Sequence, residues 1–204
     1  MGVISRIITN CRVCGSKNLI PIFSFGDLYV SDFLDLNESA QADLKVSLEL
    51  IFCDPAQEGC GLLQLRHTVS REEMYRNYWY RSGVNKTIRD ELADIVRNIE
   101  SIILLKSGDF VIDIGSNDST LLRAYKVPGL NTIGFEPAKN LVQKYGTEGV
   151  TRVISDFFNF SIWQKEHKNQ KAKVITAIAM FYDLDDPNAF VVDMVKCLDD
   201  DGLI

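Results

Sequence analysis

The stretch at residues 110–122, FVIDIGSNDSTLL, constrains the fold of this chain more than any other. Its first five residues are mostly apolar and predict a short buried strand of a parallel sheet, which Gly115 ends. Residues 117–120 are candidates for a helix N-cap, and two leucines then begin a new apolar face. A strand, a tight turn and a helix start predict the first βα unit of a nucleotide-binding domain.

Asp113 interrupts the apolar run of this strand. A carboxylate inside a buried strand is costly unless something pairs with it. At the carboxyl end of the strand it is placed to meet the amino group or sugar hydroxyls of a ligand, which favours S-adenosylmethionine over a dinucleotide. Asn117 and Ser119 stand where further glycines are expected, so an ordinary βα turn with a capping aspartate remains an alternative.

Further ligand-binding candidates follow the next strands. The apolar run NTIGFEP ends in Glu136, about 20 residues after the first turn, where an acid holds a ribose diol. Asp156 and Phe157 come just past a third strand and suit an adenine, whose amino group donates a hydrogen bond while its face stacks. Met180 ends a fourth strand, close to where the methyl donor would lie.

The order of elements predicts a doubly wound, Rossmann-like α/β sheet. Strands at 110–115, 131–135, 150–154 and 173–179 alternate with helices, which is typical of a parallel sheet. A helix at 89–106 carries one apolar stripe and should cover one face of that sheet. An apparent fifth strand begins at Gly202, and we expect the chain to be a fragment that lacks the last strands.

Four cysteines in the first third predict a metal site. Cys11 and Cys14 are separated by two residues, so both thiolates can face one ion. Cys53 and Cys60 flank the turn of a predicted hairpin, whose unusually long spacing requires a bulge. The Cys-Gly step occurs at both Cys14 and Cys60, which indicates two knuckles facing one structural zinc; four unrelated buried thiols are the alternative.

Other residues of this region receive structural interpretations. His67 is expected to be a surface or core imidazole, and Cys197 a small buried apolar residue of a helix. Residues 21–43 read as irregular, and their aromatic side chains as packing residues of a metal-stapled domain with little core of its own. These aromatic side chains are Phe23, Phe25, Tyr29 and Phe33.

A linking segment joins the two predicted domains. A capping box at Ser70 opens a short helix, and the aromatic run YWYRSGVN at 78–85 follows. That run either closes over a substrate or packs the domains together. The predicted organisation is a zinc-binding domain at 1–69, a link at 70–107 and a cofactor-binding domain at 108–204.

Composition excludes several classes of partner. The 204 residues carry a net charge of −6 without a basic run, which argues against nucleic acid. No apolar stretch approaches the length of a membrane span, and the first residues lack the features of a signal peptide. We therefore expect a cytoplasmic protein with reduced or metal-bound cysteines.

With these motifs in place, the chain resembles the zinc-containing C-methyltransferases that act on nucleotide-linked deoxysugars. The resemblance follows, in order, CRVCG, CDPAQEGCGLLQL, YWYRSG, DIGSND, GFEP, SDFF and AMFYDLDDP. It implies zinc on the four cysteines named above and Tyr80 as the catalytic tyrosine near the sugar. It also implies an S-adenosylmethionine pocket lined by Asp113, Gly115, Asn117, Asp118, Glu136, Pro137, Asp156, Phe157 and Met180.

Two departures from the family pattern are the wide spacing of the second cysteine pair and Ser119 in place of a glycine. The family's histidine- and tyrosine-bearing segment, associated with deprotonating the sugar carbon, would lie beyond Ile204. The implied reaction is methyl transfer to a carbon beside a keto group. Two alternatives remain: a non-catalytic zinc-ribbon interaction module with an α/β domain, and an NAD-dependent sugar enzyme.

Overall fold

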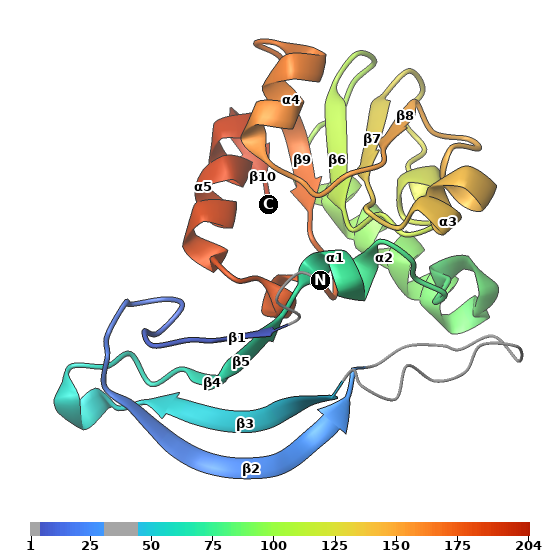
Figure 1. Cartoon of the computed structure of the whole chain (residues 1–204). Helices are drawn as coiled ribbons and strands as arrows, with labels where there is room; N and C mark the ends of the chain where they lie inside the picture. The colour runs from blue at the N-terminus through green and yellow to red at the C-terminus, as the bar shows by residue number, and fades with distance from the viewer. Residues whose placement is uncertain (1–4, 31–44) are drawn as a thin grey trace, which may run out of the picture. The chain divides into compact units, whose positions relative to one another are not determined.

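The computed structural model describes residues 5–30 and 45–204 (Figure 1). By its contacts the chain divides into two compact units. The first contains Met1–Arg76 and Asp185–Asn188, and the second contains Asn77–Leu184 and Ala189–Ile204. Among the described residues, no helix is both long and apolar enough to cross a membrane.

The first unit is built from antiparallel strands. The strands β2 (Leu19–Tyr29), β3 (Lys45–Cys53) and β4 (Leu63–Leu65) form a three-stranded sheet in the order β2-β3-β4. The strands β1 (Ser5–Ile7) and β5 (His67–Val69) form a separate pair. The predicted return strand after Cys60 is therefore divided, because its first part pairs with β3 and its second part with β1.

Strand β2 corrects the prediction that residues 21–43 are irregular. Leu19–Tyr29 is a continuous strand that pairs with β3, while residues 31–44 lie outside the described part of the chain. Its register shifts twice, between Pro21 and Phe23 and again between Ser24 and Asp27, so its apolar residues do not alternate regularly. Pro21 is tolerated because β2 is an edge strand of its sheet.

The aromatic residues of β2 are not packing residues as predicted. Phe23, Phe25 and Tyr29 each expose more than half of their surface, and Phe33 is not among the described residues. The rings of Phe23 and Phe25 contact each other edge to face, with centroids 4.7 Å apart. These three rings therefore contribute little to the core of this small unit, which leaves more of its stability to other interactions.

The second unit contains a parallel sheet of five strands in the order β10-β9-β6-β7-β8. Their bounds are β6 Phe110–Ile114, β7 Asn131–Phe135, β8 Arg152–Ile154, β9 Ala172–Thr176 and β10 Leu198–Leu203. Two strands thus lie on each side of β6, and the order reverses between β6 and β9. The predicted doubly wound sheet is confirmed, although the last strand begins at Leu198 rather than Gly202.

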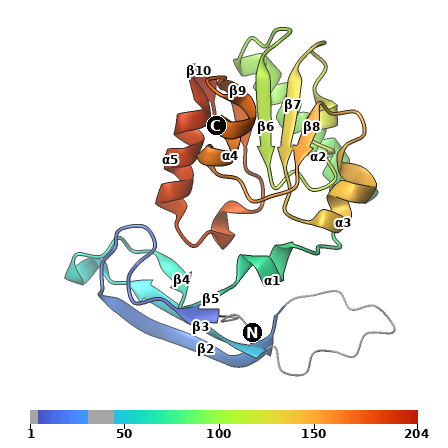
Figure 2. The ribbon, with the colours of Figure 1, turned by 45° about the horizontal axis from the view of Figure 1, so that its top comes forward.

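The two faces of this sheet bury alternate residues of each strand. Ile112 and Ile175 face a core formed with Trp163 and Met194. These last two residues come from α4 (Phe160–His167) and α5 (Pro187–Cys197), which lie on one face of the sheet (Figure 2). Cys197 is fully buried in the same core, as predicted.

Val111 and Val174 face the opposite core, which Ile99 of α2 (Lys86–Ile102) completes. The predicted covering helix is thus confirmed, with a start three residues earlier because Asn85 caps the Thr87 amide. The helix ends at Ile102, before the predicted end at residue 106, and Ile102 is 71% exposed. The short helix α1 (Arg71–Tyr75) follows Ser70, but the Ser70 side chain makes no capping hydrogen bond.

The connections after β6 and β7 differ from the predicted helices. Between β6 and β7 the chain forms a 3₁₀ turn at Leu122–Ala124 and no α-helix anywhere in that fully described stretch. Asn117 and Ser119 have positive φ angles and Pro128 follows soon after, so too few residues remain for an α-helix. After β7, α3 (Lys139–Leu141) continues into a π-helical turn at Val142–Gly146.

Gly134 of β7 lies where neighbouring side chains approach the strand closely. A Cβ atom at this position would lie 2.5 Å from Ser116 Oγ and 3.2 Å from Val153 Cγ2. We expect Gly134→Ala to destabilise the protein by about 1–3 kcal/mol in thermal unfolding, because the buried Ser116 side chain must move away from the added methyl group. Added to Ser116→Gly, the same substitution should cost much less; equal costs in both backgrounds would contradict this packing.

Candidate functional site

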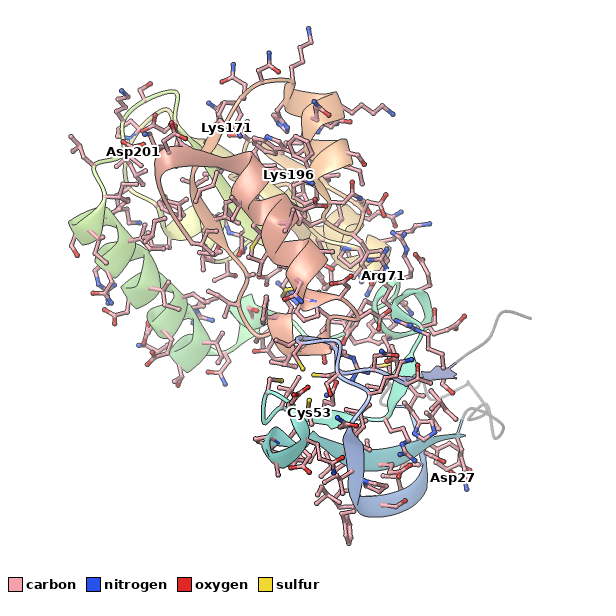
Figure 3. The ribbon with its side chains drawn as sticks, turned by 90° about the vertical axis from the view of Figure 1, so that its left-hand side faces the viewer. Asp27, Cys53, Arg71, Lys171, Lys196 and Asp201 are labelled. Atoms are coloured by element: carbon pink, nitrogen blue, oxygen red, sulfur yellow. The ribbon has the colours of Figure 1, made fainter. Side chains whose placement is uncertain are left out.

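Four thiols of the first unit lie together although they come from distant parts of the chain. The sulfur atoms of Cys11, Cys14, Cys53 and Cys60 all lie within 4.8 Å of one another. Cys11 Sγ is 3.6 Å from Cys60 Sγ, and Cys14 Sγ is 3.5 Å from Cys53 Sγ. Tetrahedral zinc with Zn–S bonds near 2.3 Å separates its sulfur ligands by about 3.8 Å, so the group fits this ion. Figure 3 shows sulfur atoms gathered near the labelled Cys53.

Two backbone turns bring these thiols into position. Gly15 and Gly61 each follow a cysteine and have φ angles of 74° and 80°, a conformation that favours glycine. The Gly15 amide donates to Cys11 O and the Gly61 amide donates to Cys53 O. The predicted bulge in the hairpin is a 3₁₀ turn at Pro55–Gln57, which takes up the extra residues between Cys53 and Cys60. The backbone amide of Cys60 then donates to Cys53 Sγ at 3.3 Å.

A buried side chain supports the cysteine cluster. Gln64 Nε2 donates to Cys11 Sγ at 3.3 Å, while Gln64 Oε1 accepts from both the backbone and the guanidinium of Arg12. Such outer hydrogen bonds orient metal ligands and disperse the charge of thiolates. Sequence patterns did not reveal Gln64, because it lies on β4 rather than in either cysteine turn. With four protein ligands the site would be closed, and hence structural rather than catalytic.

The second cluster of site residues lies at the carboxyl edge of the parallel sheet. In open α/β sheets, ligands bind outside the carboxyl ends of the strands where the strand order reverses. In this chain that point lies between β6 and β9, with β7 on the other side of β6. We call residues 115–120, which follow β6, the β6 loop.

Asp113 is a buried carboxylate near the end of β6. It is 5% exposed and pairs in register with Thr176 of β9, whose Oγ1 donates to Asp113 Oδ1 at 2.7 Å. Burial raises the pKa of Asp113 to about 7, and the nearby Glu136 carboxylate adds to this increase. Thr176 was not identified from the sequence, because a threonine that ends a strand carries no distinctive pattern.

Glu136 directly follows β7 and is 6% exposed. Its two oxygens accept from the backbone amides of Asn117, at 2.7 Å, and Ala138, at 2.8 Å. Burial raises the pKa of Glu136, and these two amides oppose the increase. A carboxylate offers about four acceptor positions, so the two that remain match the two hydroxyls of a ribose diol.

The β6 loop has the backbone of a glycine-rich turn with fewer glycines. Gly115, Asn117 and Ser119 all have positive φ angles, of 72°, 53° and 62°. The two positions at which glycines were expected are therefore the positions that adopt the left-handed conformation. Asn tolerates this conformation well, whereas Ser119 is strained and compensates with a hydrogen bond from Oγ to Gly146 O at 2.7 Å.

The other predicted cofactor residues surround the same edge of the sheet. Met180 does not end the fourth strand as predicted, because β9 ends at Thr176 and Met180 directly precedes a 3₁₀ turn at Phe181–Asp183. It lies against Gly115, since a Cβ atom on that glycine would lie 3.4 Å from Met180 Cγ. Pro137 lies between Glu136 and Ala138, the residue whose backbone amide donates to Glu136 Oε1. Asp156 and Phe157 follow β8 and are half-buried, with the Phe157 amide donating to Asp156 Oδ1. Their roles toward a cofactor remain predictions.

Residues 78–83, here called the aromatic segment, belong to the second unit and contact the β6 loop. Asn117 Oδ1 accepts from the Ser82 amide at 3.0 Å, and Asn117 Nδ2 donates to Tyr80 O at 2.9 Å. Asp118 is 1% exposed and accepts from the Gly83 amide at 3.0 Å. Tyr80 as a whole is 44% exposed, although its main chain is held by Asn117.

Comparison with known proteins identifies the second unit. Residues 80–204 match the protein family described as "Methyltransferase domain". The chain belongs to the methyltransferase domain family. Residues 11–75 match a second family, described as "Putative zinc binding domain", and this match includes the four clustered cysteines. The resemblance recognised in the sequence is thus confirmed for a zinc-binding module followed by a methyltransferase domain.

A curated relative gives a more specific comparison. The methyltransferase chain is 27% identical over 158 residues to the C-methyltransferase NovU of Streptomyces niveus. The alignment covers 77% of this chain and 37% of NovU. The chain therefore spans little more than a third of the length of this relative.

The cysteine cluster leads to a first prediction for this site. We expect the purified protein to contain about one zinc per chain, measured by mass spectrometry of the element after dialysis. Cys60→Ser should lose most of this zinc, because a hydroxyl is a poor replacement for a thiolate ligand. Cys197→Ala, which removes the one cysteine outside the cluster, is the matched control and should retain it. Equal zinc contents in Cys60→Ser and wild type would contradict the site.

The raised pKa of Asp113 leads to a second prediction. The protonated carboxyl is favoured in the folded state, so its stabilising contribution is present below pH 4 and is lost as the pH rises through about 7. We expect the free energy of unfolding of Asp113→Asn to exceed that of wild type by on the order of a few kcal/mol at pH 8, and this difference to be clearly smaller at pH 5.

The exposed Asp94 of α2 provides the control for this experiment. Asp94→Asn should shift the melting temperature by a similar small amount at both pH values, since solvent screens its ion pair with Arg97. A difference between Asp113→Asn and wild type that stays constant from pH 5 to pH 8 would show that Asp113 does not titrate as described.

Proposed function

We propose that this methyltransferase chain binds S-adenosylmethionine and supplies the donor-binding part of a C-methyltransferase acting on a nucleotide-linked keto-deoxysugar. The observation that carries the proposal is the pair of buried carboxylates that end adjacent strands, Asp113 on β6 and Glu136 after β7. The family match supports methyl transfer, and the printed name of NovU supports carbon as the acceptor. The deoxysugar rests on the resemblance of the motifs.

The two acids have complementary roles in this proposal. The Asp113 carboxylate binds the amino group of the methionine part, and the positive charge of that group favours the ionised carboxylate. The two free acceptor positions of Glu136 receive the ribose hydroxyls, while its other positions stay occupied by backbone amides. Asp156 and Phe157 bind the adenine, and Met180 lies near the methyl group. Bound S-adenosylmethionine supplies a sulfonium methyl group that a carbon nucleophile can attack.

The β6 loop argues against the dinucleotide alternative. Dinucleotide sites place the pyrophosphate at a helix N-terminus, where backbone amides and the helix dipole favour negative charge. Here the loop leads into a 3₁₀ turn at Leu122–Ala124, and the carboxylate of Asp118 is buried within it. The loop therefore lacks the helix N-terminus that holds a pyrophosphate in dinucleotide sites, whereas S-adenosylmethionine has no phosphate to hold.

The remaining predicted residues concern the acceptor and the environment of the enzyme. Tyr80 is proposed as the catalytic tyrosine near the sugar, supplied by the aromatic segment whose main chain the β6 loop holds. The zinc site is proposed to stabilise a domain at 1–69, joined through residues 70–107 to the cofactor domain at 108–204. We also propose a cytoplasmic location, because the expected substrate is a nucleotide-linked sugar.

Calorimetry with fragments of the donor tests the proposal. We expect S-adenosylhomocysteine and adenosine to bind the wild-type chain and NAD to fail. Asp113→Asn should weaken S-adenosylhomocysteine by more than about tenfold but leave adenosine unchanged, since a charged hydrogen bond contributes about 1.5–3 kcal/mol. Glu136→Gln should weaken both ligands.

Proton release gives this calorimetry a second readout. Near pH 7 the bound amino group should displace a proton from Asp113, so the measured enthalpy should depend on the buffer in wild type and not in Asp113→Asn. Equal affinity of both proteins for S-adenosylhomocysteine would remove the proposed pocket. Zinc binding without affinity for any of these ligands would favour the non-catalytic module.

A further inference from the structure

The side chain of Asn117 is engaged with the aromatic segment at both ends of its amide. Its oxygen accepts from the Ser82 amide and its nitrogen donates to Tyr80 O, at 3.0 and 2.9 Å. The side-chain amide thus bonds the main chain with one donor and one acceptor, as a neighbouring strand would. The amide therefore holds the main chain on both sides of Arg81.

The backbone of the same residue contacts the proposed ribose acid. Asn117 N donates to Glu136 Oε2 at 2.7 Å, so Asn117 joins Glu136 to Tyr80 and Ser82. Its φ of 53° turns the backbone amide and the side chain toward these different partners. A residue with an ordinary negative φ would not present both groups in this way.

Two further contacts hold the aromatic segment close to the β6 loop. A Cβ atom on Gly83 would lie 2.6 Å from Asp118 Oδ2, so the backbone approaches this buried carboxylate as closely as glycine allows. The Arg81 guanidinium lies 3.6 Å from Asp118 and stacks on the Tyr145 ring at 3.5 Å. Ion pairing and stacking of this kind fix arginine more firmly than either contact alone.

The beginning of the segment is held separately. Asn140 Oδ1 accepts from the Tyr78 amide, and Asn140 Nδ2 donates to Tyr78 O at 2.8 Å. The main chain from Tyr78 to Gly83 is thus fixed at both ends to the elements that follow β6 and β7. Meanwhile Tyr78, Trp79 and Tyr80 are 37%, 46% and 44% exposed.

We infer that Asn117 is a positioning residue that couples donor binding to the placement of Tyr80. This inference rests on the proposed function, since it takes Glu136 as the ribose ligand. A donor that binds Glu136 restricts the motion of Glu136 and of the Asn117 amide bonded to it. The Asn117 side chain then restricts the motion of the main chain at Tyr80 and Ser82. Because coupling between two sites is reciprocal, a fixed segment must also favour the donor by the same factor. Asn117 acts through Tyr80 and Glu136 and is not itself a catalytic residue.

Hydrogen exchange of the ligand-free protein tests the anchoring. Asn117→Gly keeps the left-handed backbone and its amide but removes both side-chain bonds. We expect the Ser82 amide, which loses its acceptor, to exchange about five- to tenfold faster in this variant, as the loss of one hydrogen bond predicts. Ser119→Gly is the comparison variant, because it relaxes the same loop but keeps both bonds of the Asn117 side chain. Unchanged exchange in Asn117→Gly would overturn the inference.

Tryptophan fluorescence with added S-adenosylhomocysteine tests the coupling. The chain has two tryptophans, and Trp163 is fully buried, so acrylamide quenching reports on Trp79. In wild type and Ser119→Gly the ligand should reduce this quenching and slow exchange at Ser82 and Gly83. In Asn117→Gly both effects should disappear while the ligand still binds, with lower affinity. A full ligand effect in Asn117→Gly would overturn the coupling.

The two proposals fail in distinguishable ways. If wild type binds no S-adenosylhomocysteine, the proposed function fails, and the coupling that rests on it fails as well. If the ligand binds with the expected dependence on Asp113 but leaves Trp79 and the Ser82 amide unchanged, the proposed function stands and the coupling fails.

Discussion

The carboxylate of Glu136 organises the edge of the sheet on which the candidate site depends. It lies past the end of β7, and it accepts hydrogen bonds from one backbone amide of the β6 loop and from one of the turn before α3. Burying a carboxylate is costly unless hydrogen bonds replace those it made to water. The two amides offset that cost, and the carboxylate in turn provides them with an acceptor. The loop after β6 and the start of the next connection are therefore held around one charged group. The aromatic segment joins the same arrangement through the side chain of Asn117.

The first unit depends on its cysteine cluster rather than on a buried carboxylate. Among its described residues, the aromatic side chains of β2 are exposed and few apolar residues are buried, so these residues offer little burial to offset the loss of chain entropy. A metal ion held by four thiols from two distant turns supplies the missing constraint in such small domains. Gln64 bonds one of these thiols and also the Arg12 guanidinium, and because Gln64 lies on β4, it links the cluster to the sheet.

Patterns with a strict geometric requirement were predictable from the sequence. The two Cys-Gly steps led to the thiol cluster, and apolar runs followed by acids led to the parallel sheet and to the burial of Asp113 and Glu136. The β6 loop also fitted, since the expected glycine positions are the left-handed ones. The family and the fold are confirmed, while the ligand roles of the site residues stay predictions.

Other features depend on tertiary contacts that the sequence does not display. Strand β2 was missed because its shifted register hides the alternation of apolar residues, and because an edge strand can contain Pro21. The helix expected after β6 is absent because two left-handed residues and a nearby proline use up a short connection. The partners Thr176, Asn140 and Tyr145 lie far along the chain from the residues they contact, and no local pattern marks them.

Ser119 shows how a strained residue can prepare a loop for its ligand. Glycine would adopt this left-handed conformation freely, but it would also leave the loop free to sample others. The serine is conformationally costly, and its bond to Gly146 confines the loop to one shape before any ligand arrives. A glycine-rich loop loses conformational entropy when it binds its ligand. Here that entropy is lost during folding, so less of it opposes binding.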